Sequence, residues 1–217
     1  MQEVGPVHRH LSRIIVNLIR PLSVRSVLDV GCGNGMNLGA IERELHPREL
    51  CGIDASPEAL RMARRVVNGQ FIALNAEGAS LRRQFDLVLT SQVIEHIPDD
   101  EAFLRNLRQM ASSYVLVTTM QGRMRPSEVL IGHLRNYTRQ GLEEKMTKAG
   151  LQPMRTVEWG FPFYSPLYRS AIEWIGGQGA RIRYDRKDRF IAWLLHHLYR
   201  LNSSRRGDVL IVLGRTI

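Results

Sequence analysis

The sequence of 217 residues predicts an α/β fold, with a seven-stranded, mostly parallel sheet that carries helices on both faces. Short apolar runs alternate with amphipathic helical segments along the chain, which is the pattern of strands joined by crossover helices. The run at 85–91 is apolar almost throughout, as expected for a strand that is buried on both faces. Three glycines at alternate positions close the segment 27–35 and indicate a tight strand-to-helix turn.

The turn after the first predicted strand has the composition of a ligand-binding loop. Residues 27–35 read VLDVGCGNG, so an apolar strand contains one acidic residue and then meets the glycines. Glycine removes side chains where the chain bends into a helix, which lets backbone N–H groups and the helix N-terminus face a bound anion. The candidate binding residues of this turn are Asp29, Gly31, Cys32, Gly33, Asn34 and Gly35. A turn with a purely structural role is the alternative.

A second acidic residue follows at the spacing expected for a nucleoside site. Asp54 lies 19 positions after Gly35, at the end of the predicted strand CGIDAS, and Ala55 follows it. A carboxylate at this place can accept hydrogen bonds from ribose hydroxyls. The glycines have the spacing G-x-G-x-G and not the G-x-G-x-x-G of dinucleotide sites, and no G-K-[ST] marks a phosphate loop. The ligand is therefore predicted to contain a nucleoside.

Two further predicted strands end in polar residues. They lie in the segments FIALNAEGAS, at 71–80, and FDLVLTSQVIEHIPD, at 85–99. Ligands of open α/β sheets bind outside the carboxyl ends of the strands, so we expect these residues at the same site as the glycine turn. The residues are Asn75, Ala76 and Glu77 after the first of these strands, and Ser91, Gln92, Glu95 and His96 after the second.

In this order, the segments resemble the class I S-adenosylmethionine-dependent methyltransferases over residues 25–160. The text at 85–99 is similar to the small-molecule branch, which includes the ubiquinone-biosynthesis-type O-methyltransferases. The resemblance implies a Rossmann-like fold and S-adenosylmethionine as the cofactor. It also implies that the glycine turn lies against the methionine portion, that Asp54 holds the ribose, and that Asn75 and its neighbours hold the adenine. Ser91 and Gln92 would then approach the methionine group.

The same resemblance bears on metal binding. In the quinone enzymes the expected pattern is E-x-x-E-H, and its acids and histidine are implicated in binding a divalent cation. Here Gln92 stands in place of the first acid, and a neutral amide is a poorer ligand for a hard cation. No Cys/His spacing indicates zinc either. We therefore expect no metal.

Two histidines are candidates for a general base, because imidazole titrates near neutral pH. His96 follows a buried strand, and a hydrogen-bonding role is the alternative for it. His133 lies on the loop after the fifth strand, where acceptor substrates approach in the resembling family. Arg135 and Tyr137 accompany His133 and are predicted to bind a carboxylate or phosphate of the substrate. Surface salt bridges are the alternative for this pair.

The chain is predicted to form a single domain. Its parts are an N-terminal amphipathic helix at 1–22, a cofactor-binding core at 25–159, a helical insertion at 160–206 and a last strand at 207–217. The insertion begins with aromatic residues, and Phe161 and Tyr164 are predicted to contact the substrate. Its helices would close over a hydrophobic substrate as a lid, rest on the cytoplasmic leaflet, or simply pack against the sheet or another subunit.

Basic residues are concentrated in the second half of the chain. Through residue 110, 13 Lys and Arg stand against 13 Asp and Glu, and beyond it 17 stand against 8, which places the whole net charge of +9 there. Such a bias fits a solvated face, an acidic substrate, an anionic membrane surface or nucleic acid. Nucleic acid is the least favoured partner, because the fourth strand ends in TSQV and lacks the N-P-P-[YF] motif of amino-directed nucleic-acid methyltransferases.

These observations together predict a methyltransferase that acts on a small or lipid-linked acceptor, most plausibly at oxygen, by in-line transfer. Transfer-RNA methylation, or a cofactor-binding regulator without turnover, are the alternatives. Cys32 and Cys51 have the character of small buried residues in a reducing compartment, and no stretch reaches the roughly 20 apolar residues of a membrane span. The expected location is cytoplasmic, with peripheral contact at the inner face of the membrane as an extension. The oligomeric state is not predicted.

Overall fold

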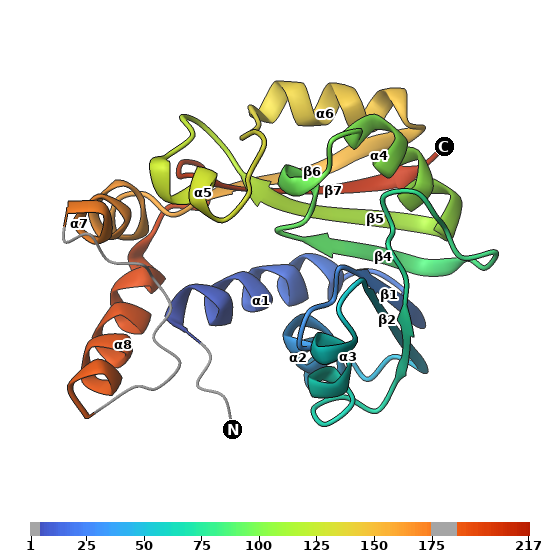
Figure 1. Ribbon diagram of the computed structural model, residues 1–217, viewed down its shortest axis with the longest axis horizontal. Helices are drawn as coiled ribbons and strands as arrows, with labels where there is room; N and C mark the ends of the chain where they lie inside the picture. The colour runs from blue at the N-terminus through green and yellow to red at the C-terminus, as the bar shows by residue number, and fades with distance from the viewer. Residues whose placement is uncertain (1–4, 175–185) are drawn as a thin grey trace.

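The computed structural model describes residues 5–174 and 186–217, and it is built on a seven-stranded sheet (Figure 1). The strand order is β3-β2-β1-β4-β5-β7-β6. Neighbouring strands are parallel except for β7, which runs antiparallel to both β5 and β6. This confirms the predicted mostly parallel sheet. The strands are β1 (Ser26–Val30), β2 (Glu49–Asp54), β3 (Gln70–Ala73), β4 (Phe85–Ser91), β5 (Ala111–Met120), β6 (Leu151–Trp159) and β7 (Val209–Thr216).

Helices cover both faces of the sheet, as predicted (Figure 1). One face carries α1 (Pro6–Ile19), α2 (Met36–Leu45) and α3 (Pro57–Ala63). The other carries α4 (Asp100–Met110) and α6 (Arg139–Lys148). The crossover helices α2 and α3 thus lie on one face and α4 on the other, and the parallel strands β1 to β5 end at the same edge of the sheet.

The two layers of core follow from the alternation of side chains along each strand. In β1, Val27 packs toward α1 and α2, whereas Leu28 and Val30 pack toward α4. All three side chains are fully buried. Burial of each such apolar side chain contributes about 1.5–3 kcal/mol relative to exposure. The apolar strands read from the sequence thus bury both of their faces.

The predicted insertion contains two longer helices, α7 (Arg169–Trp174) and α8 (Arg186–Leu198), and 175–185 lies outside the described residues. An irregular helix, η2 (Phe163–Tyr168), precedes α7 and has a kink at Ser165. In α8, the carbonyl of His196 lies 2.8 Å from Nε2 of His10, which ties this helix to α1. The remaining short elements are η1 (Ile94–His96), α5 (Pro126–Leu130) and η3 (Tyr199–Leu201).

Within the described residues, no helix combines the length and the apolar character that crossing a membrane requires.

Candidate functional site

The glycine turn connects β1 to α2 at the carboxyl edge of the sheet. Gly31, Gly33 and Gly35 have φ angles of +74°, +53° and +80°, in the left-handed region that other residues rarely adopt. Space is also restricted at Gly31, where an added Cβ would lie 2.4 Å from Cγ2 of Val93. The turn therefore needs glycine both for its backbone conformation and for the close approach of the segment that follows β4.

Asp54 ends β2 beside this turn. Its Oδ2 accepts a hydrogen bond from the Gly33 N–H at 2.8 Å, and its Oδ1 accepts one from the Ser56 N–H at 2.8 Å. These contacts fix the orientation of the carboxylate. A carboxylate offers about four lone-pair sites, so two remain for the hydroxyls of a ribose.

Asp29 lies beneath the turn and is only 1% exposed. Among the described residues, neither of its carboxyl oxygens has a hydrogen-bond partner. Burial, together with the negative charge of Asp54, raises the pKa of Asp29 to about 8. An orphaned buried carboxyl group is suited to a ligand that brings a cationic or hydrogen-bond-donating group to it. Burial also raises the pKa of the neighbouring Cys32 thiol, which stays neutral.

A cavity of about 300 Å³ opens where the loops after β1, β2, β3 and β4 meet. It brings together seven of the predicted cofactor residues and the predicted base His96. Larger cavities lie along α1, but they contain none of these residues. The lining residues are Val30, Gly31, Asp54, Ala55, Leu74, Asn75, Ala76, Glu77, Gln92, Val93, His96, Ile97 and Phe103.

The other predicted cofactor residues do not line this cavity. Asp29, Cys32, Gly33, Asn34 and Gly35 form the turn at its edge. Ser91 lies at the end of β4, where its hydroxyl is 2.8 Å from that of Thr118. Sequence reasoning missed the apolar walls, although all of them except Phe103 lie next to a residue that it selected. These walls are Val30, Leu74, Val93, Ile97 and Phe103.

The residues present fit an adenosyl compound that carries an amino acid. Asp54 has free lone pairs for ribose hydroxyls, and the orphaned carboxyl of Asp29 suits the ammonium group of a methionine moiety. Apolar walls such as Leu74 and Phe103 suit a flat base. The Asn75 side-chain oxygen accepts a hydrogen bond from the Glu77 N–H at 3.1 Å and retains a second lone pair for an amino group.

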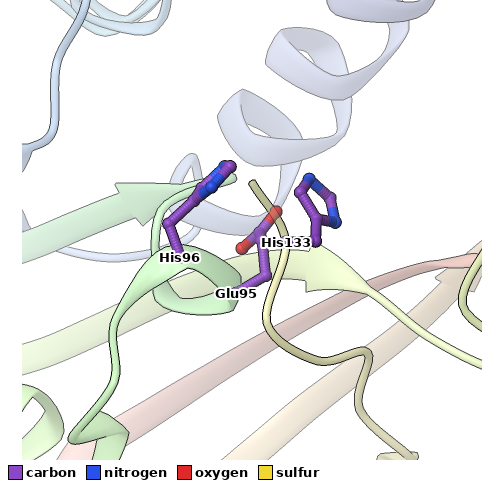
Figure 2. Close-up of side chains that lie close together, drawn as sticks. All are labelled: Glu95, His96 and His133. Carbon is purple, nitrogen blue, oxygen red and sulfur yellow. The ribbon is translucent and has the colours of Figure 1, made fainter. Parts of the chain in front are cut away.

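Beyond β4, the chain brings an acid and two histidines together (Figure 2). Glu95 and His96 lie on η1, and His133 lies on the loop after α5. The loop is held there because the Leu134 N–H donates to the Glu95 carbonyl at 2.9 Å. The two imidazole rings meet edge to face with centroids 4.7 Å apart, and the Glu95 carboxylate lies between them in Figure 2.

This cluster is largely shielded from solvent. Glu95 is fully buried, and burial raises its pKa to about 7, while the Thr119 hydroxyl donates to its Oε2 at 2.9 Å. Burial lowers the pKa of His133, and the neighbouring His96 lowers it further. Nδ1 of His96 lies 3.1 Å from the carbonyl of Gly132. His133 can therefore stay neutral near pH 7.

The same three side chains could also hold a cation, although the sequence led us to expect no metal. One potential ligand atom from each of Glu95, His96 and His133 lies within 4.8 Å of the others. Two imidazoles and a carboxylate form a donor set that transition metals and zinc accept. Sequence reasoning considered Gln92 in this role and missed His133, which only the folding of the loop brings to Glu95.

Arg135 and Tyr137, predicted to bind substrate, are engaged in the protein's own packing. Tyr137 is 5% exposed, and its hydroxyl donates to Asp100 Oδ2 at 2.8 Å. Arg135 donates to the carbonyls of Ile97 and Pro98 and pairs with Asp100 at 3.2 Å. These donors have partners within the fold, which favours the salt-bridge alternative over the predicted contact with substrate.

Phe161 and Tyr164 do not line the cavity that contains Asp54. Tyr164 stacks on Trp159 with ring centroids 5.3 Å apart, and burial raises its pKa to about 12. The guanidinium of Arg206 lies 4.2 Å above the ring of Phe161. This packing of the insertion against the end of β6 does not support their predicted contact with substrate.

Comparison with known proteins shows which family this chain is similar to. A family model described as a methyltransferase domain matches residues 7–156. The ubiquinone biosynthesis O-methyltransferase of Azoarcus sp. (strain BH72) is 36% identical over 98 residues, which cover 42% of this chain and 41% of that protein. A protein of the same description from Rhizobium johnstonii is 30% identical over 128 residues, or 55% of this chain and 51% of that protein. The chain thus spans about half the length of these relatives, or less.

Solved structures share the fold over nearly the whole chain. A methyltransferase in complex with the Haloferax volcanii Trm112 activator has a TM-score of 0.67 at 15% identity, covering 96% of this chain and 89% of that one. Magnesium protoporphyrin IX methyltransferase from Synechocystis PCC 6803, with bound S-adenosylmethionine, has a TM-score of 0.59 at 13% identity, covering 97% and 80%. At such identities the likeness shows the fold alone, which is that of the class I methyltransferases.

Proposed function

This chain belongs to the methyltransferase domain family, its cofactor is S-adenosylmethionine, and we propose that it methylates a hydroxyl group of a small or lipid-linked acceptor. The observation that carries the proposal is the position of His96, which lines the cavity of Asp54 and contacts His133. An oxygen acceptor must lose its proton when it takes a methyl group, and a neutral imidazole beside the cofactor can receive that proton. The O-methyltransferase relatives support the same choice of acceptor atom.

The reaction needs alignment more than it needs covalent chemistry from the protein. The sulfonium of the bound cofactor supplies an electrophilic methyl group, which the acceptor oxygen attacks in line. The glycine turn and Asp54 hold one partner in place, and this positioning removes much of the entropic cost of the encounter. The cavity walls around Phe103 limit the access of water.

The hydrogen bonding of His96 supports a role in proton transfer. When Nδ1–H donates to the Gly132 carbonyl, 3.1 Å away, Nε2 carries the lone pair and can accept the hydroxyl proton. The buried carboxyl of Glu95, whose other oxygen lacks a partner among the described residues, can then stabilise the resulting imidazolium. His133 is the second candidate, because its ring meets that of His96.

The surroundings of His133 support an apolar acceptor. Val129, Leu130 and Ile131 precede it and are 56%, 80% and 66% exposed, and Leu134 after it is 49% exposed. Apolar side chains gathered beside a cavity mark a surface that contacts an apolar ligand or a membrane. Acceptors with an apolar ring or chain next to the reacting hydroxyl fit this rim.

Exposed apolar side chains in the insertion also support a lipid-linked acceptor. Arg125 and Ser127, at the start of α5, contact Glu173 of α7, so these helices lie together at one end of the molecule, which α8 also occupies (Figure 1). At this end α8 exposes Phe190, Ile191, Trp193 and Leu194, and α7 exposes Trp174. We propose that this end rests on the cytoplasmic leaflet of the membrane, where aromatic side chains and arginines are favoured.

Transfer of a labelled methyl group tests the proposal. Purified protein is incubated with methyl-labelled S-adenosylmethionine and either catechol or a lipid extract, and the product is analysed by mass spectrometry. We expect a methyl ether, and we expect His96→Gln to lower kcat by about 100-fold with little effect on cofactor affinity, since general-base catalysis contributes factors of this order. Label recovered only in RNA or on amine nitrogen would contradict the proposal.

A chelator separates the acid–base role of the cluster from a metal-binding role. We expect methyl transfer to continue when EDTA is present, since a neutral His96 suffices as the base. Loss of activity with EDTA, restored by added Mg²⁺ or Zn²⁺, would instead make Glu95, His96 and His133 a metal centre.

A further inference from the structure

A groove of about 540 Å³ lies between α1, β6 and η3, away from the cavity of Asp54. The two share no lining residue. Three arginines from separate elements line the groove: Arg13 of α1, Arg155 of β6 and Arg200 of η3. No acidic residue is among its lining residues. The groove is therefore a concave surface of positive charge on the α1 face of the sheet.

The charges of these arginines are not balanced by carboxylates within the described residues. In the described part of the chain, Arg13, Arg155 and Arg200 form no ion pair. By contrast, Arg20 on the same helix as Arg13 pairs with Glu44 at 2.9 Å, and Arg169 is held by two carboxylates. Like charges that converge on one groove repel one another unless an anion lies between them. The arrangement thus suits a bound anion.

Two buried polar atoms on residues that line the groove have no hydrogen-bond partner within the described residues. Tyr199 is fully buried, and its hydroxyl has no partner within the described residues. The side-chain nitrogen of Asn202 is also buried without a partner in that part of the structure. The Asn202 oxygen is fixed by the Phe163 N–H at 2.9 Å, so its amide nitrogen has a set direction. Buried donors left unpaired cost stability unless a ligand or water satisfies them.

The histidines beside the groove do not add charge to it. His10 stacks on Trp159 with ring centroids 5.7 Å apart, and its Nε2 faces the His196 carbonyl. Burial lowers the pKa of His10, and the positive charges of Arg13 and Arg200 lower it further. The positive potential of the groove therefore comes from its arginines, which stay charged at every physiological pH.

We propose that this groove is a second binding site, which takes the phosphate group of an organic phosphoester. Arginine forks match phosphate oxygens, and the neutral donors of Tyr199 and Asn202 complete the set. The volume exceeds that of one phosphate and leaves room for an organic part against Trp159 and Val157. A soluble phosphoester and a phospholipid headgroup share this chemistry. The site does not depend on the proposed methylation reaction.

Calorimetry with glycerol 3-phosphate tests the site. The variant Arg155→Gln/Arg200→Gln is compared with Arg105→Gln/Arg139→Gln, which removes the same charge from α4 and α6 on the opposite face of the sheet. All four side chains are on exposed residues, so both variants should fold. We expect the first variant to bind glycerol 3-phosphate at least about tenfold more weakly than the second, because charge-assisted hydrogen bonds are lost. Cofactor affinity should be equal in the two variants.

Vesicles identify the source of the phosphate. If vesicles of phosphatidylglycerol bind with the same dependence on Arg155 and Arg200, and vesicles of phosphatidylcholine do not, the ligand is an anionic lipid headgroup. Binding of glycerol 3-phosphate without vesicle binding makes it a soluble phosphoester. Tyr199→Phe removes one donor without changing shape and should weaken binding while leaving the Tm unchanged or higher. Equal binding by the two arginine variants in both assays would overturn the proposal.

Discussion

Asp54 and Asp86 make the same kind of contact at opposite ends of the sheet. Asp54 accepts backbone N–H groups beside the glycine turn, and Asp86 Oδ2 accepts those of Arg25 and Ser26, at 2.8 and 3.0 Å, where β1 begins. Both carboxylates therefore stabilise a strand end. Only Asp54 lines the cavity assigned to the cofactor.

This pair gives a matched test of the ribose contact. Asp54→Asn should weaken the binding of S-adenosylhomocysteine by about tenfold or more, since hydrogen bonds to a charged group contribute about 1.5–3 kcal/mol. Asp86→Asn should lower the free energy of unfolding but leave that affinity unchanged. Isothermal titration calorimetry measures the affinities and thermal unfolding measures the stabilities. Equal affinities for the two variants would argue against Asp54 as the ribose ligand.

Asp29 makes the stability of the cofactor-free protein depend on pH. Its pKa is raised to about 8 in the folded chain, whereas the ordinary pKa of an aspartate, 3.8, applies in the unfolded chain. Between these values the folded state keeps a proton that the unfolded state has lost, so stability falls as pH rises through this window. Asp29→Asn should remove this dependence and raise the Tm above pH 8. Thermal unfolding between pH 5 and 9 checks it, and identical Tm profiles for the two proteins would contradict it.

At the residue scale, the site residues at the strand ends could be predicted from the sequence, whereas the contacts between distant segments could not. Asp54 and Asn75 could be predicted because parallel strands end at one edge, which places their last residues together. The partners of Arg135 and Tyr137 could not, because Asp100 is more than 30 positions away and only the packing of α4 against α6 brings it near. The sequence does not show whether a polar side chain forms its hydrogen bonds with a substrate or with a buried carboxylate of the protein.

At the scale of elements, this same network joins α4 to the loop before α6. Asp100 is 5% exposed and accepts hydrogen bonds from Tyr137 at 2.8 Å and from Lys145 of α6 at 2.9 Å. The two cations beside it and the tyrosine hydroxyl hold the pKa of Asp100 below its usual range, against the effect of burial. The network fixes α6 and the loop that carries His133.

Tyr137→Phe tests whether this network is structural. The change should lower the free energy of unfolding by about 1–2 kcal/mol, because one hydrogen bond to a buried charge is lost. KM for the acceptor should stay the same, since the ring remains in place. Chemical denaturation and steady-state kinetics give the two quantities. A large rise in KM with unchanged stability would restore Tyr137 as a substrate residue.

The order of elements could be read from the sequence, and so could some of their ends. Thr138, a residue type favoured before a helix, caps α6 by accepting the Gly141 N–H at 3.0 Å, and the amphipathic pattern near the N-terminus corresponds to α1. The meeting of His133 with Glu95 could not be read, because it depends on the path of the loop after α5. Local patterns specify helices and strands, whereas loop paths follow from contacts with the finished core.

At the scale of the whole molecule, α7 and α8 lie at one end (Figure 1), and their described residues include several exposed apolar side chains. Trp193 is 56% exposed and stacks on Phe190, which is 63% exposed, with ring centroids 6.0 Å apart. The proposed contact with an anionic leaflet would bury these rings. The same end carries the apolar rim beside His133.

Replacing Trp193 tests this contact. Trp193→Ser should weaken co-sedimentation with phosphatidylglycerol vesicles by about tenfold, because burial of a large apolar side chain contributes about 1.5–3 kcal/mol. Ile72→Ser is the control, since Ile72 is 39% exposed on β3 at the far edge of the sheet. If both variants sediment with vesicles as the unaltered protein does, α8 does not contact the membrane.

We infer that one edge of the sheet binds the cofactor and presents its methyl group to the cluster of Glu95, His96 and His133. A crystal structure with bound S-adenosylhomocysteine tests it most directly. We expect the ribose hydroxyls of the ligand to contact Asp54 and its amino group to point toward Asp29. Its sulfur should lie on the side of the cavity lined by Gln92 and His96. A cofactor bound elsewhere, or with its sulfur turned away from His96, would contradict it.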